Sequence, residues 1–151
     1  MAFNARDLAV NGVRALQPYQ PGKPVEELER DLGLSDIVKL ASNENPRTSD
    51  EVIAKALAQQ QSDTSRYPDG SGYALKIRLS DLLGVSTDQL TLGNGSNDVL
   101  ELLVRAFVCP GQGVVVSEHS FAVYSLAASA AGANLKTAPA ISWGHDLDAM
   151  L

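Results

Sequence analysis

The fold of this chain is decided by the stretch Thr91-Leu92-Gly93-Asn94-Gly95-Ser96-Asn97-Asp98. The apolar residues 90–92 predict a short strand, the two glycines predict a tight turn, and Ser96 predicts the cap of a helix with an apolar face. A strand that turns directly into a helix aims unpaired backbone N–H groups and the positive end of the helix dipole at one point. The stretch therefore predicts a cradle for a phosphate group, although such turns also occur in α/β proteins without a ligand.

Two common kinds of phosphate-binding motif do not fit this stretch. The dinucleotide-binding fingerprint requires a third glycine, which neither Val99 nor its neighbours supply. A P-loop requires a lysine directly after its glycines, and no lysine lies between Lys76 and Lys136. The stretch therefore predicts a glycine-turn phosphate site of another class, with dinucleotide binding as a weaker alternative.

Apolar periodicity along the rest of the chain alternates between the two kinds of secondary structure. It predicts helices over residues 24–32, 50–61, 75–83, 96–107 and 120–131, and strands over residues 37–40, 90–92, 114–116 and 133–138. This alternation predicts an α/β fold with a mainly parallel sheet and flanking helices. Residues 1–23 carry prolines and a glycine close together, which predicts an extended N-terminal arm. Asp146 is expected to cap one more short helix.

The composition limits the partners and the location. The 151 residues are 44% hydrophobic and carry a net charge of −6, which is typical of a globular domain and unfavourable for binding nucleic acid or an anionic membrane. The sequence has no secretory signal and no apolar run of membrane-spanning length. The single cysteine, Cys109, excludes an internal disulfide and fits a cytoplasmic protein, and we expect it to be buried. His119 and His145 form no metal-binding pattern, so no metal is expected.

A second segment is a candidate ligand contact. Residues 117–124 follow the apolar strand over residues 114–116, and in a parallel sheet they open at the same edge as the glycine turn. Phe121 or His119 would then meet a ligand there, because a flat aromatic side chain is a suitable wall for a flat heteroaromatic ring. The alternative interpretation is that Phe121 and Tyr124 simply face the core.

Several short motifs, taken in order, give the chain a specific resemblance. Together they resemble the histidinol-phosphate aminotransferases, which are fold-type I enzymes that depend on pyridoxal phosphate. The motifs extend over almost the whole chain, and their shared order is more specific than any one of them. The matching runs are residues 13–22 (VRALQPYQPG), 39–46 (KLASNENP), 66–70 (RYPDG), 93–97 (GNGSN) and 110–124 (PGQGVVVSEHSFAVY).

The resemblance implies pyridoxal 5'-phosphate as the cofactor and gives roles to particular residues. The backbone amides of Gly95, Ser96 and Asn97 would hold the cofactor phosphate, as the glycine turn suggests on physical grounds. Phe121 occupies the position of the aromatic residue that stacks on the pyridine ring. Tyr67, in a loop whose local pattern leaves packing and anion binding both open, matches a tyrosine that reaches the cofactor phosphate of the neighbouring subunit. The site would then be shared across a homodimer.

The resemblance also implies a substrate and a domain plan. Tyr19 matches an arm tyrosine near the phosphate and imidazole end of the substrate, and Asn43 would lie beside the substrate carboxylate. Residues 1–35 would form the arm and first helix, and residues 36–151 the first part of the cofactor-binding large domain. The reaction would exchange an amino group between glutamate/2-oxoglutarate and histidinol phosphate/imidazole-acetol phosphate in histidine biosynthesis, with small molecules as the partners.

Two features depart from the family pattern. Polar residues 47–50 replace the stiff stretch rich in glycine and proline that usually follows the Asn-Pro pair. The Schiff-base lysine of the family is expected beyond Leu151, so this chain by itself holds no catalytic residue and is expected to be inactive. The alternatives are another class I or II aminotransferase or a pyridoxal-phosphate decarboxylase, or a non-catalytic module that binds phosphate or dimerises.

Overall fold

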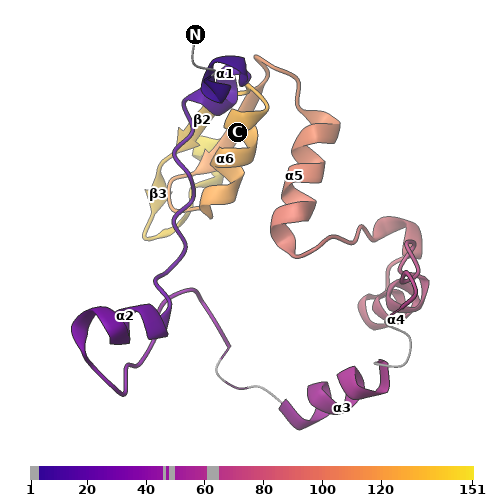
Figure 1. Cartoon of the computed structure of the whole chain (residues 1–151). Coiled ribbons are helices and arrows are strands. Elements are labelled where there is room, and N and C mark those ends of the chain that lie inside the picture. Colours follow the sequence, from indigo (N-terminus) through magenta and orange to yellow (C-terminus); the bar gives the residue numbers. More distant parts are fainter. Residues whose placement is uncertain (1–3, 46, 48–49, 61–64) are drawn as a thin grey trace. The chain divides into compact units, whose positions relative to one another are not determined.

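The computed structural model describes residues 4–45, 47, 50–60 and 65–151. They form two compact units, whose elements are labelled in Figure 1. One unit consists of Met1–Tyr19 together with Asp88–Leu151, and the other consists of Gln20–Thr87. The domain boundary expected after residue 35 stays a prediction.

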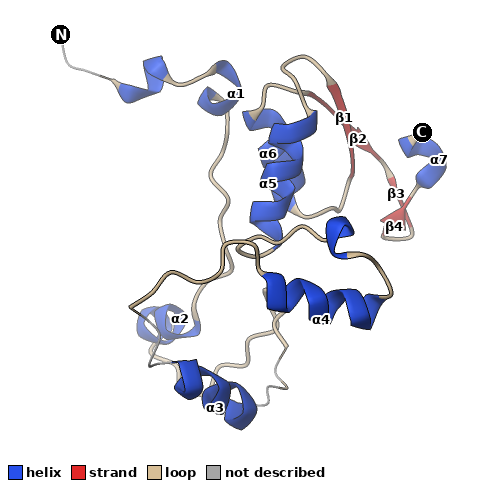
Figure 2. Cartoon of the chain, turned by 90° about the vertical axis from the view of Figure 1, so that its right-hand side faces the viewer, coloured by secondary structure: helices blue, strands red, loops and turns tan. Residues whose placement is uncertain are grey.

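The first unit contains the parallel strands that the sequence predicts. Strand β1 (Gly113–Ser117) pairs with β2 (Asn134–Ala138) in a parallel ladder that aligns the first residues of the two strands with each other. Helix α6 (Ala122–Ala130) connects them (Figure 2), because two parallel strands cannot be joined by a tight turn. This strand–helix–strand unit confirms the predicted α/β class.

A hairpin and a short helix follow the ladder. Strands β3 (Ala140–Ile141) and β4 (Gly144–His145) pair antiparallel to each other. The N–H of Ala149 donates a 3.0 Å hydrogen bond to Asp146 Oδ1. Asp146 therefore caps α7 (Leu147–Met150), as the sequence predicts.

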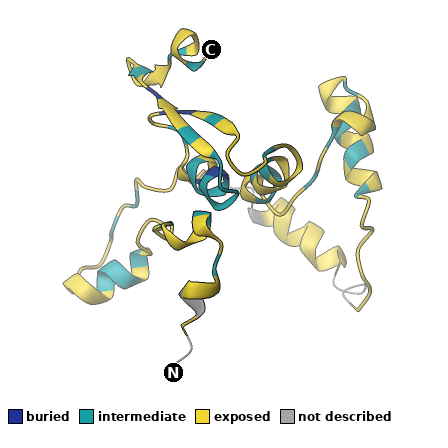
Figure 3. Cartoon of the chain, turned by 90° about the horizontal axis from the view of Figure 1, so that it is seen from above, coloured by how far each residue is buried: buried dark blue, intermediate teal, exposed yellow. Residues whose placement is uncertain are grey.

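The core of the first unit lies between the ladder and α6, where the buried positions of Figure 3 are found. Helix α5 (Ser96–Phe107) and the short α1 (Asn11–Arg14) both pack on α6. The small side chains of the alanine-rich α6 allow this close approach. The buried residues are Val116, Ser117, Val123, Ala128 and Ala138.

Hydrogen bonds from both backbone and side chain hold together the chain at the start of the two strands. The N–H of Gly111 donates to the carbonyl of Gly132 at 2.8 Å, and Asn134 Nδ2 donates to the carbonyl of Gly111 at 2.7 Å. Cys109 lies in this region and is exposed, so the prediction that it is buried is wrong. Helix α5 ends at Phe107, so its apolar face does not continue as far as Cys109.

The N-terminal segment is less extended than predicted. It contains a 3-10 turn, η1 (Ala5–Leu8), and the helix α1, and it loses regular structure only before the prolines. The Arg14 side chain ties the two turns together, because its Nε donates to the carbonyl of Ala9 at 2.7 Å and its Nη2 donates to the carbonyl of Asp7. This segment is therefore a folded piece followed by an extended one.

Two of the predicted strands are wrong. Residues 37–40 and 90–92 adopt no regular structure and have no ladder partner within the described ranges. Val38 and Leu40 are largely exposed. A strand is stabilised by its neighbour rather than by its own residues, so an apolar run without a partner does not become one.

The second unit contains α2 (Val25–Leu32), α3 (Asp50–Gln60) and α4 (Tyr73–Leu83), close to the predicted ranges. Gly33 and Gly84 end α2 and α4 with φ angles of 62° and 68°, a left-handed conformation that glycine adopts without a steric penalty. Among the helices that the structure describes, none is long and apolar enough to cross a membrane.

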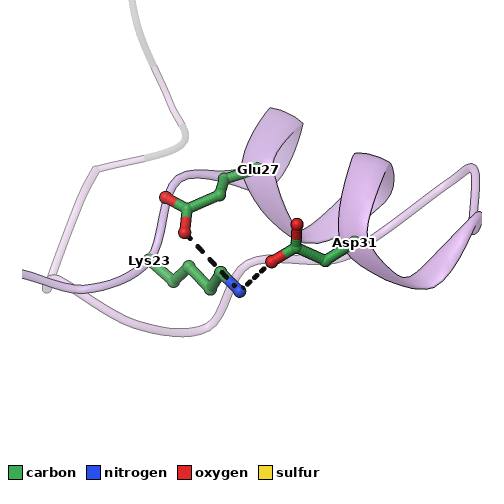
Figure 4. Close-up of polar contacts among 3 residues, drawn as sticks. All are labelled: Lys23, Glu27 and Asp31. Atoms are coloured by element: carbon green, nitrogen blue, oxygen red, sulfur yellow. Dashed lines mark hydrogen bonds and ion pairs between the residues drawn. The ribbon is translucent and has the colours of Figure 1, made fainter.

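Three exposed charged residues, Lys23, Glu27 and Asp31, interact with one another at α2. Lys23 Nζ donates to Asp31 Oδ2 and lies 3.6 Å from Glu27 Oε1 (Figure 4). The hydrogen bond to Asp31 is the largest effect that raises the pKa of Lys23. Solvent screens all three groups, so this cluster orients the segment before α2 and contributes little to stability.

The start of α4 is held by Asp69. Its Oδ2 accepts a 2.8 Å hydrogen bond from the N–H of Tyr73, and its Oδ1 accepts bonds from the N–H and the hydroxyl of Ser71 at 2.9 and 2.8 Å. The bond from Tyr73, followed by those from Ser71, lowers the pKa of the Asp69 carboxyl. Asp69 therefore caps a helix whose N-cap residue, Gly72, has no side chain.

We predict that Asp69→Ala raises hydrogen exchange of the first-turn amides of α4 several-fold. A carboxyl with a lowered pKa contributes stability that is present above its unfolded pKa and is lost as the pH falls through its folded pKa. The wild-type amides should therefore lose protection only below the ordinary value of 3.8. Asp69→Asn should remove this pH dependence, whereas Asp81→Ala near the other end of α4 should leave it intact. Unchanged exchange in Asp69→Ala would show that the carboxylate is not the cap.

A second prediction concerns the apolar face of α3, on which Val52, Ile53 and Leu57 are all largely exposed. We predict that the 151-residue chain by itself self-associates, because exposed apolar stripes gain free energy by covering one another. Sedimentation velocity over a range of concentrations measures this. The pair Ile53→Lys and Leu57→Lys should shift the distribution toward monomer, and Gln59→Lys on the same helix should not. A wild-type monomer at all concentrations would contradict the prediction.

Candidate functional site

The turn before α5 has the form that a phosphate cradle needs, with one difference from prediction. Gly95, not Ser96, is the N-cap residue of α5, and no side chain caps the helix there, so the predicted Ser96 cap is wrong. Gly95 has a φ of 81°, which favours glycine. A Cβ at Gly93 would lie 2.9 Å from Val99 Cγ2 and 3.1 Å from Asp98 Oδ2. Gly95 is therefore favoured by its backbone conformation, and a side chain at Gly93 would have to displace the Val99 and Asp98 side chains.

The backbone amides of this turn are not equally available to a ligand. The N–H of Gly95 donates to the carbonyl of Gly93 at 2.9 Å, and the N–H of Asn94 donates to Asp98 Oδ2 at 3.0 Å. Ser96 and Asn97 open the first turn of α5, where backbone N–H groups have no intrahelical acceptor. An anion would thus be met first by the amides of Ser96 and Asn97 and by the Ser96 hydroxyl.

Phe121 stands at the N-terminus of α6, directly after the loop that leaves β1. Phe121 and Tyr124 are each 43% exposed, so the alternative in which both face the core is wrong. The ring of Tyr19 meets the ring of Phe121 edge to face, with centroids 6.0 Å apart and planes at 81°. The structure therefore brings together two of the residues that the sequence singled out, although 102 positions separate them in the chain.

Two hollows flank these residues in the first unit. One, of about 510 Å³, lies between the N-terminal segment, α5 and α6, and has Tyr19 and Asn97 among its lining residues. The other, of about 490 Å³, lies beside β1 and has Phe121 and Ser117 among its lining residues. Both volumes are in the range of small-molecule sites. Tyr19 lines the first hollow and Phe121 lines the second, so each ring is placed where it could meet a ligand.

The second hollow also contains a feature that the sequence reasoning missed. Trp143, in the β3–β4 turn with a φ of 66°, stacks on the imidazole of His119 at 4.8 Å and 29°. His145 from β4 lines the same hollow. The two residues of this tight turn with positive φ angles, Ser142 and Trp143, are not glycines, and Gly144 comes only after them. In the described part of the chain, no group of three His, Cys, Asp or Glu residues is placed to hold a metal ion.

The other two predicted site residues, Tyr67 and Asn43, belong to the second unit. The Tyr67 side chain is fully exposed and precedes the loop that Asp69 fixes. Asn43 is exposed and has a φ of 50° in a turn that the Lys39–Glu44 ion pair closes at 2.9 Å. Each is thus presented to solvent on a locally fixed loop, as a residue that contacts a ligand or a partner subunit would be.

Known proteins resemble this chain over most of its length. The family model for aminotransferase class I and II matches residues 35–151. Histidinol-phosphate aminotransferase 1 of Idiomarina loihiensis is 53% identical over 148 residues, which are 98% of this chain and 40% of that protein. Histidinol-phosphate aminotransferase 2 of Pseudomonas fluorescens is 53% identical over 146 residues, which are 95% of this chain and 40% of that protein. The chain spans about 40% of the length of these curated relatives.

Two solved structures share the fold. The histidinol-phosphate aminotransferase of Sinorhizobium meliloti, solved in complex with pyridoxal-5'-phosphate, superposes with a TM-score of 0.79 at 27% identity, over 94% of this chain and 37% of that one. The kynurenine aminotransferase of Pyrococcus horikoshii superposes with a TM-score of 0.65 at 21% identity, over 96% of this chain and 38% of that one. The α/β class predicted from the sequence is therefore that of fold-type I enzymes. Since the family model matches well over half of its residues, this chain belongs to the class I and II aminotransferase family.

Proposed function

We propose that this chain is the N-terminal part of a histidinol-phosphate aminotransferase, which exchanges an amino group between glutamate/2-oxoglutarate and histidinol phosphate/imidazole-acetol phosphate in histidine biosynthesis. The observation that carries the proposal is 53% identity to a histidinol-phosphate aminotransferase along 98% of the chain. The glycine turn, the Phe121 ring and the arm tyrosine lie in one unit of the structure, which supports it.

The residues present fit pyridoxal 5'-phosphate as the cofactor. Gly95 leaves open space at the N-terminus of α5 for a phosphate, which the amides of Ser96 and Asn97 and the Ser96 hydroxyl would hold. The Gly95 amide would join them once it leaves the carbonyl of Gly93. When bound, the cofactor supplies an electrophilic carbon and an electron sink for amino-group transfer. Phe121 would stack on its ring and exclude water from one face.

The remaining roles complete the proposal. Tyr19, next to Phe121, would contact the phosphate and imidazole end of the substrate. Asn43 would lie beside the substrate carboxylate. The exposed Tyr67 would reach the cofactor phosphate of a second subunit in a homodimer, in the cytoplasm. The lysine that binds the cofactor covalently would be supplied from outside these residues, so we propose that this chain alone does not turn over.

The first test is substrate preference. We predict that the complete protein, supplied with pyridoxal phosphate, forms glutamate from histidinol phosphate and 2-oxoglutarate. Histidinol without its phosphate should react with a kcat/KM about 100-fold lower, because the phosphate contributes binding energy that the site is built to use. Phenylalanine, kynurenine and 2-aminoadipate serve as competing donors. Faster reaction with any of these three would replace the substrate assignment, and no amino transfer from any donor would overturn the proposed function.

The second test is the stacking role of Phe121. We predict that Phe121→Leu weakens pyridoxal phosphate binding by about tenfold, since the flat contact is lost while apolar volume is kept. An absorbance titration of the complete protein with the cofactor measures this without relying on turnover. Phe107→Leu, an equal change at an exposed position at the end of α5, is the matched control and should bind the cofactor normally. Equal affinity in Phe121→Leu and wild type would remove Phe121 from the cofactor site.

A further inference from the structure

Gly12 makes the closest backbone contact of the N-terminal segment. A Cβ at this position would lie 2.2 Å from the carbonyl oxygen of Ser129, 3.0 Å from that of Ala130 and 3.1 Å from the amide nitrogen of Gly132. All three atoms belong to the backbone at the C-terminal end of α6, so no flexible side chain can move aside. Gly12 lies in the helix α1 and does not have a positive φ. Space, not backbone conformation, is therefore what requires glycine here.

The arm has a second fixed point at the opposite end of the same helix. Tyr19 packs on Phe121, which is the N-cap residue of α6. The arm thus runs along α6 from its C-terminal end, at Gly12, to its N-terminal end, at Tyr19, as Figure 1 shows for α1 and the segment that follows it. The nine residues of α6 span about 14 Å, and the seven steps from Gly12 to Tyr19 reach at most about 25 Å when fully extended, so the segment can connect the two ends of the helix.

Two residues between the fixed points face a hollow, and Arg14 braces the start of this segment. Val13 and Leu16 line the hollow between the arm, α5 and α6, together with Tyr19 itself. The Arg14 side chain donates hydrogen bonds to the carbonyls of Asp7 and Ala9. It therefore connects α1 to the residues that precede it. Moving Gly12 away from α6 would therefore displace the whole segment and not a single side chain.

We propose that Gly12 is a positioning residue for substrate recognition. Its backbone contact with the end of α6 sets the register of the arm along that helix, and this register places Tyr19 at the ring of Phe121. The docking follows from the structure alone. Its effect on the substrate rests on the proposed function, in which Tyr19 contacts the substrate and Phe121 contacts the cofactor.

The test substitution is Gly12→Ala in the complete protein. Alanine is the better helix former, so a merely local role of Gly12 in α1 predicts stronger protection of the segment. Loss of docking predicts the opposite: faster hydrogen exchange over residues 9–19, KM for histidinol phosphate raised about tenfold, and kcat and pyridoxal phosphate affinity changed by less than about twofold. Gly113→Ala is the matched control, because a Cβ at Gly113 meets no atom within 4 Å. It should behave as wild type in every measurement.

A second variant tests register without touching the contact. One glycine inserted between Gln17 and Pro18 leaves Gly12 on α6 and shifts only Tyr19. It should raise KM as Gly12→Ala does, while the exchange of residues 9–14 stays at the wild-type rate. In a Tyr19→Ala background, Gly12→Ala should raise KM no further, since both changes act through the same ring.

The outcomes test separately the docking of Gly12 on α6 and the register that places Tyr19 at Phe121. Wild-type exchange over residues 9–19 in Gly12→Ala would overturn the docking, and so would exchange slower than wild type. Normal KM in the insertion variant, or multiplying effects of Gly12→Ala and Tyr19→Ala, would overturn the register. If the wild-type protein transfers no amino group yet Gly12→Ala accelerates exchange of the arm, the proposed function fails and the docking stands.

Discussion

The crossover helix α6 is the element on which the rest of the first unit depends. Parallel pairing of β1 with β2 needs a connection that returns to the same end of the sheet, and α6 provides it. Among the residues that the structure describes, the few buried side chains all lie on β1, β2 or α6. The same helix begins at Phe121 and ends where the arm docks. A change that shifts α6 would therefore move the ladder, the ring and the arm together.

Those parts of the fold that depend on neighbours in sequence were predictable from it. Helices α2 and α4 end at Gly33 and Gly84, because a left-handed residue stops a helix wherever it occurs. Strands β1 and β2 were predictable because the helix between them brings them together within a short stretch of chain. The helix cap at Asp146 depends on one local hydrogen bond and was equally visible.

Features that depend on a distant partner were not predictable in this way. The apolar residues 37–40 and 90–92 look like strands, but a strand exists only with a ladder partner. Gly12 looks like a helix-weakening residue until the carbonyls of Ser129 and Ala130 are seen beside it. The sequence predicts the Gly95 N–H as a phosphate donor, but it does not reveal that this N–H donates to the carbonyl of Gly93 in the structure. In each case the missing information is the position of a second backbone segment.

The charge balance around the glycine turn indicates how this site would hold a phosphate. The charged side chain of Asp98 lies at the turn, where it accepts a hydrogen bond from the Asn94 N–H. Arg105 on the same helix lies 3.4 Å from Glu101, and both side chains line the hollow that Asn97 borders. That pair is formally neutral, so the acidic character of the chain is not reversed at this site. Among the described residues around this turn, the first-turn amides and the dipole of α5 are the groups that would attract a phosphate, and they act over short range and depend on placement more than on net charge. Gly95 suits this arrangement, because it has a φ of 81° and leaves open space at the N-terminus of α5, so an anion can approach the backbone closely.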